Sequence, residues 1–213
     1  MDWGLARRSI AWLRADGEAI AVFREARGLL ALQGVSLYQP SGLGSVVADV
    51  SVEPLPGSPE WLAYRGLERR VAWRVVERDP WRALSLALAA PRRAFETLSV
   101  GVDPGKLCAV SVVADGFLLR AWKTPCRILG SSLAAFLGRI PHRRAVVTVG
   151  SGPGVVEAVS SLSEASLEYG VADESWTTSR PALWRPLRHL KDRDLAASAT
   201  IALTSSSRRR AMI

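Results

Sequence analysis

The chain is poor in residues that build metal and disulfide frameworks: its 213 residues include two cysteines, Cys108 and Cys126, and two histidines, His142 and His189. Neither histidine has another histidine or a cysteine close to it in sequence, so the spacing predicts no zinc site. Both cysteines fall within or at the ends of predicted strands. We therefore expect two buried thiols rather than a disulfide framework.

Long apolar runs are absent as well. No window approaches the roughly 18 consecutive apolar residues that identify a membrane-spanning helix. The first residues, MDWGLARRSIAWLRADGEA, lack the basic start and the continuous apolar stretch of a signal peptide. These two absences predict a soluble, cytoplasmic protein with no membrane partner.

Lysine is also scarce, with 3 lysines against 25 arginines, and the formal net charge is +8. Most of the excess lies in residues 98–213, whose net charge is +6, compared with +2 for residues 1–97. A positively charged surface attracts anionic partners such as nucleic acids. Two explanations of the arginine excess stay open: bidentate recognition of phosphate groups and the composition of the genome.

The chain divides into two halves, and residues 1–97 are predicted to form an N-terminal α+β domain or elaboration of unknown role. The Asp16–Gly17 pair predicts a turn. The segment 58–94 is predicted to be helical, with Ser58 as its N-cap and a proline at the first helical position. Two further prolines, Pro80 and Pro91, should break or end what would otherwise be one long helix.

Residues 98–213 are predicted to form a second domain with the element order β-β-β-α-β-α-β-α. The first strand, TLSVGVDPG, is followed by two strands joined at Asp115–Gly116, a strong signal for a two-residue hairpin. Helical and strand-like segments then alternate up to a final helix. This order predicts an α/β fold: a mixed sheet of three antiparallel strands and then parallel strands, flanked by helices.

Carboxylates recur at the ends of elements in this second half. They are Asp103 after the first strand, Asp173 and Glu174 after the last, and Asp192 and Asp194 at the start of the final helix. Taken singly, such residues are turn formers or helix N-caps. Carboxylates that gather at one edge of a sheet repel one another unless a cation holds them. Together they therefore predict a site for a hard cation, Mg²⁺ or Mn²⁺.

Four motifs in this half occur in the order VGVDPGK, VVTVGSGPG, VADESWTT and KDRDLAASATIAL. In this order they resemble the YqgF branch of the RuvC-like Holliday junction resolvases, within the ribonuclease H-like superfamily, over about residues 98–207. The resemblance implies a ribonuclease H-like sheet and two-metal phosphodiester hydrolysis. It assigns Asp103, Glu174 and Asp194 as catalytic residues and as ligands of Mg²⁺ or Mn²⁺.

The resemblance and the charge together predict a metal-dependent endonuclease that acts on structured DNA, with branched DNA as its partner. Cleavage of two symmetric junction strands would favour a homodimer. The basic side chains expected to contact phosphates are Lys106, Arg143, Arg144, Arg180, Arg185 and Arg188; a solvated basic face is the alternative for each of them.

Two other functions stay open. Position 175 is serine where the family has arginine, which favours a catalytically inactive nucleic-acid-binding module of the same fold. The glycine-rich turn at residues 150–154 could instead cradle a phosphate through its backbone N–H groups, as in a nucleotide-binding, ATPase-like protein.

Overall fold

The computed structural model describes residues 8–40, 45–172 and 190–210, the last five of them by their backbone only. The chain divides into two compact units, one comprising Met1–Phe95 with Arg139–Pro141, the other Glu96–Gly138 with His142–Ile213. Among the described residues, no helix combines the length and the apolar character that crossing a membrane requires. The cytoplasmic location stays a prediction.

The first unit contains a four-stranded parallel sheet in the order β2-β1-β3-β4. Its elements are β1 (Arg8–Trp12), α1 (Gly17–Ala31), β2 (Val35–Tyr38), β3 (Val46–Glu53), α2 (Pro59–Tyr64), β4 (Arg69–Val76) and α3 (Pro80–Ala89). Buried apolar side chains of α1 pack on this sheet, and the ring of Phe23 lies 6.4 Å from that of Trp12.

Helices in this unit begin at capping residues. Ser58 accepts a hydrogen bond from the N–H of Trp61, as predicted, and Asp16 caps α1 rather than forming a separate turn. The prediction of a helical segment over 58–94 is wrong in its middle, because Arg69–Val76 is strand β4. Pairing with β3 and the strand preference of its valines and tryptophan override the helix propensity of its arginines.

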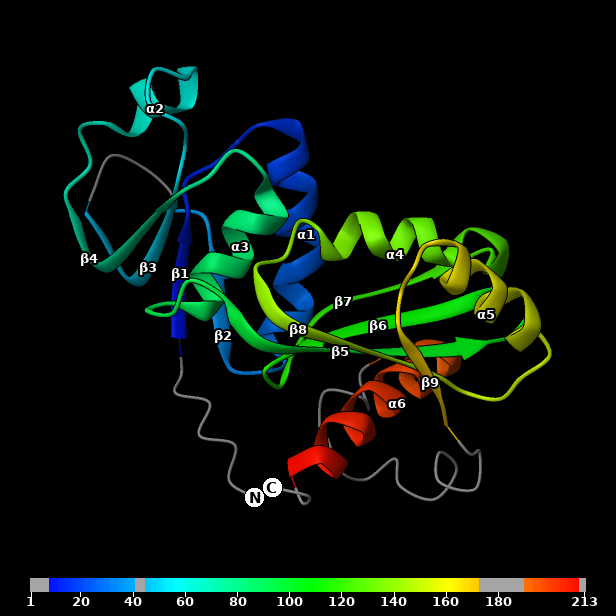
Figure 1. Ribbon diagram of the computed structural model, residues 1–213. Coiled ribbons are helices and arrows are strands. Elements are labelled where there is room, and N and C mark those ends of the chain that lie inside the picture. The colour runs from blue at the N-terminus through cyan, green and yellow to red at the C-terminus, as the bar shows by residue number, and fades with distance from the viewer. Residues whose placement is uncertain (1–7, 41–44, 173–189, 211–213) are drawn as a thin grey trace. The chain divides into compact units, whose positions relative to one another are not determined.

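The second unit contains a five-stranded mixed sheet in the order β7-β6-β5-β8-β9. Its elements are β5 (Phe95–Pro104), β6 (Cys108–Ala114), β7 (Phe117–Thr124), the 3₁₀ turn η1 (Cys126–Ile128), α4 (Leu129–Leu137), β8 (His142–Val149), α5 (Val155–Glu164), β9 (Tyr169–Val171) and α6 (Arg193–Arg210). The predicted order of strands and helices is confirmed. Figure 1 shows α4 and α5 on one face of this sheet and α6 on the other.

The first three strands of this sheet are antiparallel, and the next is parallel to the first. β6 pairs with both β5 and β7 in antiparallel register. The predicted hairpin at Asp115–Gly116, where both residues have positive φ, joins β6 to β7. The N–H of Gly150 at the end of β8 donates to the carbonyl of Val102 near the end of β5, so the two strands end together. β9 is parallel to β8.

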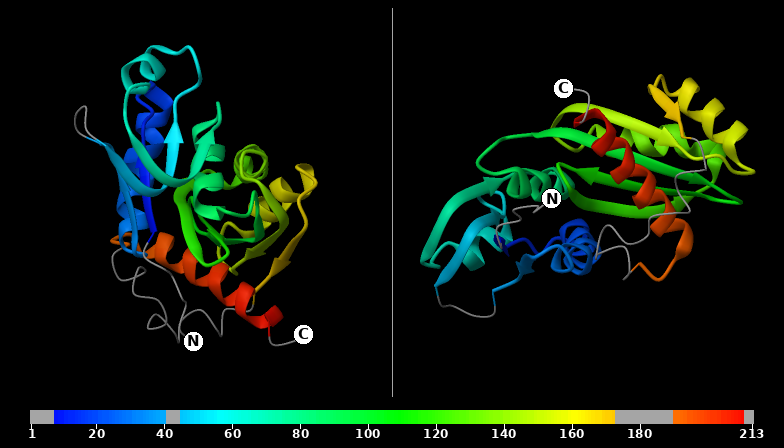
Figure 2. Two further views of the ribbon diagram at one scale, coloured as in Figure 1. Left: turned by 90° about the vertical axis from the view of Figure 1, so that its left-hand side faces the viewer. Right: turned by 90° about the horizontal axis from the view of Figure 1, so that it is seen from below.

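Helix α6 lies directly against the middle of the sheet. In the view from below in Figure 2 it crosses in front of the strands. The hydroxyl groups of Ser111 and Ser198 are hydrogen-bonded at 2.8 Å, and both residues are fully buried. β6 is buried at every position, so it is covered on both faces. The sheet and α6 are therefore packed together beneath the residues at the ends of the strands.

Cys108 and Cys126 form a disulfide with an S–S distance of 2.09 Å, so the expectation of two buried thiols is wrong. The hairpin explains the pairing, because it places Thr124 opposite Cys108 and brings Cys126, two residues further on, within 5.0 Å between Cα atoms. Apart from those of hyperthermophiles, cytosolic proteins rarely hold structural disulfides. The disulfide and the predicted cytoplasmic location therefore point to different compartments.

Candidate functional site

Asp103 lies near the end of β5, in line with Lys123 two strands away. Asp103 is the register partner of Ala109 on β6, and Ala109 is in turn the partner of Lys123 on β7. Directly opposed residues point to the same face of a sheet. The carboxylate and the ammonium therefore start from the same face, about 10 Å apart between Cα atoms.

That shared face is the one covered by α6. A Cβ placed on Gly101 would meet the backbone of Ser198 and Ala202, so this position of β5 faces the helix. Side chains two residues apart on a strand point the same way, which directs Asp103 to the α6 face as well. The structure thus brings two of the three predicted ligands, Asp103 and Asp194, to one face at one end of the sheet.

Lys123 binds both carboxylates at the start of α6. Its ammonium nitrogen lies 2.6 Å from Oδ2 of Asp194 and 2.8 Å from Oδ2 of Asp192. Asp192 also accepts hydrogen bonds from the backbone N–H groups of Asp194 and Leu195 and so caps the helix, one of the alternatives open from sequence.

These contacts shift the proton affinities of the pair. Hydrogen bonds from Lys123 lower the pKa of the Asp192 carboxyl below its usual value. Conversely, hydrogen bonds to Asp192 and then to Asp194 raise the pKa of the Lys123 ammonium. The lysine is therefore a fixed positive charge at this end of the helix.

The glycine-rich turn after β8 packs on the loop that follows Asp103. Cβ atoms on Gly152 and Gly154 would lie 2.4 Å and 2.6 Å from the carbonyl oxygens of Pro104 and Gly105. The N–H groups of Gly150 and Gly154 donate to Val102 and Pro104. These glycines serve close packing between two loops, and two of the N–H groups that a phosphate cradle would use are already bonded.

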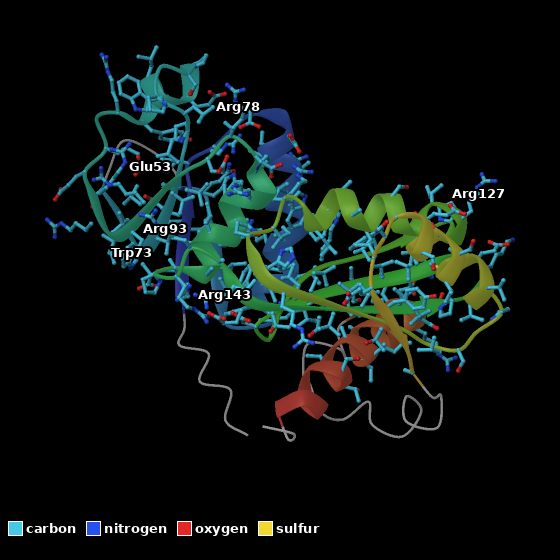
Figure 3. The ribbon with its side chains drawn as sticks, in the orientation of Figure 1. Glu53, Trp73, Arg78, Arg93, Arg127 and Arg143 are labelled. Atoms are coloured by element: carbon cyan, nitrogen blue, oxygen red, sulfur yellow. A yellow bond between two sulfur atoms is a disulfide. The ribbon has the colours of Figure 1, made fainter. Side chains whose placement is uncertain are left out.

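The predicted basic residues lie at different ends of the sheet. Lys106 is exposed in the loop after Asp103, at the candidate site. Arg143 lies at the start of β8, 3.6 Å from Glu96 at the start of β5, and Arg144 is its exposed neighbour. The length of β5 separates them from Asp103 by about 23 Å. Figure 3 shows Arg143 and the exposed Arg127 at opposite ends of this unit.

Several predicted site residues lie outside the described residues. They are Asp173, Glu174, Arg180, Arg185 and Arg188. Within residues 8–40, 45–172 and 190–205, no group of three or more His, Cys, Asp or Glu side chains is arranged to hold a metal ion. Of the three predicted metal ligands, Asp103 and Asp194 are therefore the two that lie within the described residues.

Sequence reasoning missed Lys123 and Arg127. Lys123 stands near the end of a predicted strand, where a lone lysine signals nothing by itself. Counting from the Asp115–Gly116 hairpin alone would place Trp122 opposite Ala109. The irregularity between Val112 and Val113 shifts the register by one residue and places Lys123 there, in line with Asp103. Arg127 follows Cys126, so its position depends on the disulfide.

Comparison of the chain with protein-family models, with curated proteins and with solved structures finds no match. A proposal about the function must therefore rest on the fold and on the placement of the side chains.

Proposed function

We propose that the chain is a divalent-metal-dependent endonuclease that acts on structured nucleic acid, with a ribonuclease H-like second unit. The observation that carries the proposal is the placement of Asp103 and Asp194 on one face, at one end of a mixed sheet. Three antiparallel strands followed by parallel strands is also the arrangement expected for a ribonuclease H-like sheet.

The predicted ligands are carboxylates, which are the donors that suit a hard cation. Asp103 and Asp194 offer carboxylate oxygens, which Mg²⁺ and Mn²⁺ prefer, and Glu174 is the third ligand that the resemblance implies. A bound divalent ion would activate a water molecule and stabilise the departing oxygen in phosphodiester hydrolysis. The reaction adds water across a P–O bond, so that hydroxide ends on phosphorus and a proton on the departing oxygen.

The chain itself supplies rigidity and charge. Asp103 follows the fully buried Val102, and the packing of Gly152 and Gly154 on Pro104 and Gly105 limits movement of its loop. Lys106 and Arg127 are exposed cations at the same end of the sheet and would contact phosphates. Because duplex DNA rises about 3.4 Å per base pair, Arg143 and Arg144 would contact the same duplex about seven base pairs away.

A catalytically inactive nucleic-acid-binding module is the second candidate. The observation that favours it is the ion pair of Lys123 with Asp194, which occupies one oxygen of a predicted metal ligand. Binding without cleavage would weaken steeply with salt, because phosphate contacts release counterions from the nucleic acid.

The test is cleavage of four-way-junction and linear DNA, and of RNA, with Mg²⁺ or Mn²⁺. We expect cleavage by the native chain and a loss of more than about 100-fold in Asp103→Asn. Glu157→Gln, which alters an exposed carboxylate of α5, is the matched control and should cleave normally. Full activity in Asp103→Asn, or no cleavage of any substrate, would refute the proposal.

Symmetric cleavage of a junction would require a homodimer, and this expectation has a test of its own. The mass of the protein bound to a four-way junction, measured by sedimentation, should correspond to two chains. One chain per junction would remove the symmetric mechanism and leave the nuclease proposal in place.

A further inference from the structure

The first unit exposes a tryptophan at the outer edge of its sheet. Among the strands that the structure describes, β4 is the outermost on its side, and it carries Trp73 (Figure 3). Trp73 is the register partner of Val50 on β3, which in turn is the partner of Ile10 on β1, so the three side chains point to one face. Val50 and Ile10 are at most 1% exposed, whereas Trp73 is 48% exposed. The apolar layer on this face therefore ends in a half-exposed indole ring.

Exposed arginines flank this tryptophan along β4. The strand has the sequence RRVAWRVV, which contains three arginines and no acidic residue. The side chains of Arg70 and Arg74 are 72% and 59% exposed, and the two residues lie about 13 Å apart along the strand. Helix α3, which packs on β4, is followed by the exposed Arg92 and Arg93. An anionic partner would therefore meet positive charge along this edge.

The acidic partners of these arginines do not prevent contact with a phosphate. Arg70 pairs with Glu68 at 2.9 Å, but both side chains are largely exposed, and such surface pairs contribute little to stability. Arg74 lies 3.6 Å from Glu53, which the mostly buried side chain of Arg69 also holds at 3.1 Å. Because Arg69 still compensates Glu53, Arg74 can turn to a phosphate without leaving a buried carboxylate unpaired.

A tryptophan between exposed arginines suits a nucleic acid strand with unpaired bases. Every base has a face on which an indole ring can stack, and arginine binds phosphate groups through paired hydrogen bonds. The bases of a duplex already stack on one another, so stacking on Trp73 requires unpaired nucleotides. A second copy of the chain fits less well, because two β4 strands side by side would bring their arginines together.

We propose that the β4 edge of the first unit is a binding surface for single-stranded nucleic acid. Trp73 stacks on an unpaired base, and Arg70 and Arg74 contact phosphates along the same strand. The inference goes beyond the proposed function, because it gives the first unit a role of its own that needs no metal ion.

The test is binding of a fluorescent oligothymidylate of about 16 nucleotides to the full chain, measured by anisotropy in EDTA. A duplex of the same length is the second probe. We expect Trp73→Ala to weaken single-strand binding by about 10-fold or more and to leave duplex binding unchanged. Trp73→Phe, which keeps an aromatic ring, should recover part of the loss. Leu62→Ala is the matched control, since it removes an exposed apolar side chain of α2 in the same unit.

The phosphate contacts have a separate signature. Arg70→Gln should weaken binding of the oligonucleotide and reduce the slope of log K against log salt by about 0.7, because one contact fewer releases fewer counterions.

Equal single-strand affinity of the native chain and Trp73→Ala, or no oligonucleotide binding by the native chain, would overturn the inference. Self-association that Trp73→Ala abolishes, with oligonucleotide binding unchanged, would also overturn it and assign β4 to a second copy. If circular dichroism shows that Trp73→Ala is unfolded, Trp73→Leu, which keeps an apolar side chain there, decides the question in the same way. Because EDTA removes divalent ions, none of these results depends on the nuclease proposal.

Discussion

A Cβ atom on Gly101 would lie 1.9 Å from the carbonyl oxygen of Ser198, so α6 rests on the bare backbone of β5. This contact determines how close the helix comes to the sheet. Because the first turn of α6 is one turn before Ser198, it also determines that Asp194 reaches Lys123. Close packing at Gly101 therefore helps to position the start of α6.

Gly101→Ala should destabilise the protein by at least about 1–3 kcal/mol, because all three nearest atoms that the methyl group would meet belong to backbone and cannot turn aside. Urea unfolding followed by circular dichroism measures the loss. Gly170→Ala on β9 is the control, since a Cβ there has nothing within 4 Å. Equal stability of the two variants would contradict the close packing of α6.

Reduction of the Cys108–Cys126 disulfide should lower the free energy of unfolding by about 3 kcal/mol, because the bond closes a loop of 18 residues in the unfolded chain. Urea unfolding with and without a reducing agent measures the difference. Cys126→Ser should match the reduced native protein and should no longer respond to the reductant. A native protein insensitive to reduction would show that the two cysteines are not paired.

Asp49 should stabilise the first unit in a pH-dependent way. Its carboxylate accepts the backbone N–H of Ser9 at 2.6 Å and the Ser9 hydroxyl at 2.9 Å. The backbone hydrogen bond, followed by the hydroxyl, lowers the pKa of Asp49 below its usual 3.8. A carboxyl whose pKa is lower in the folded state stabilises the protein above its unfolded pKa, and this contribution is lost as the pH falls through the folded value.

The stability difference between the native protein and Asp49→Asn should therefore be constant from about pH 7 to about pH 5 and shrink toward about pH 3. Urea midpoints of the two proteins across this range measure it. A difference that stays unchanged at the acid end would mean that Asp49 is not bonded to Ser9.

Lys123 should be the slowest of the three lysines to undergo reductive methylation. Its ammonium is held between Asp192 and Asp194, and the raised pKa leaves less of the reactive neutral amine at any given pH. Mass spectrometry of the labelled protein separates Lys123 from Lys106 and Lys191. All three residues are exposed, so a slower rate at Lys123 would report its ion pair. Equal rates at all three would show that the ion pair does not persist in solution.

Local patterns predicted much of the second unit. Alternation and buried apolar runs indicated its strands, the Asp115–Gly116 pair indicated the hairpin, and the order of elements followed. The placement of Asp103 near the end of a strand followed in the same way. These features depend on neighbours within a few residues, where turn chemistry and periodicity operate.

Features that depend on distant residues were predicted badly. The segment Arg69–Val76 is a strand because β3 lies beside it, although its composition also suits a helix. The disulfide forms because the hairpin register carries Cys126 back to Cys108. The sequence likewise did not show that Arg143, expected to contact phosphates, lies at the other end of the sheet from Asp103, where β8 begins.

The sequence by itself determined which segments form strands and helices after residue 97, and that carboxylates stand at the ends of those segments. Only the tertiary structure decided that Asp103 and Asp194 share a face, and that Lys123 already holds Asp194. The reason is physical: periodicity and capping act over a few residues, whereas strand register and helix packing join side chains some 70 to 90 positions apart. The ion pair of Lys123 with Asp194 is a contact of that second kind.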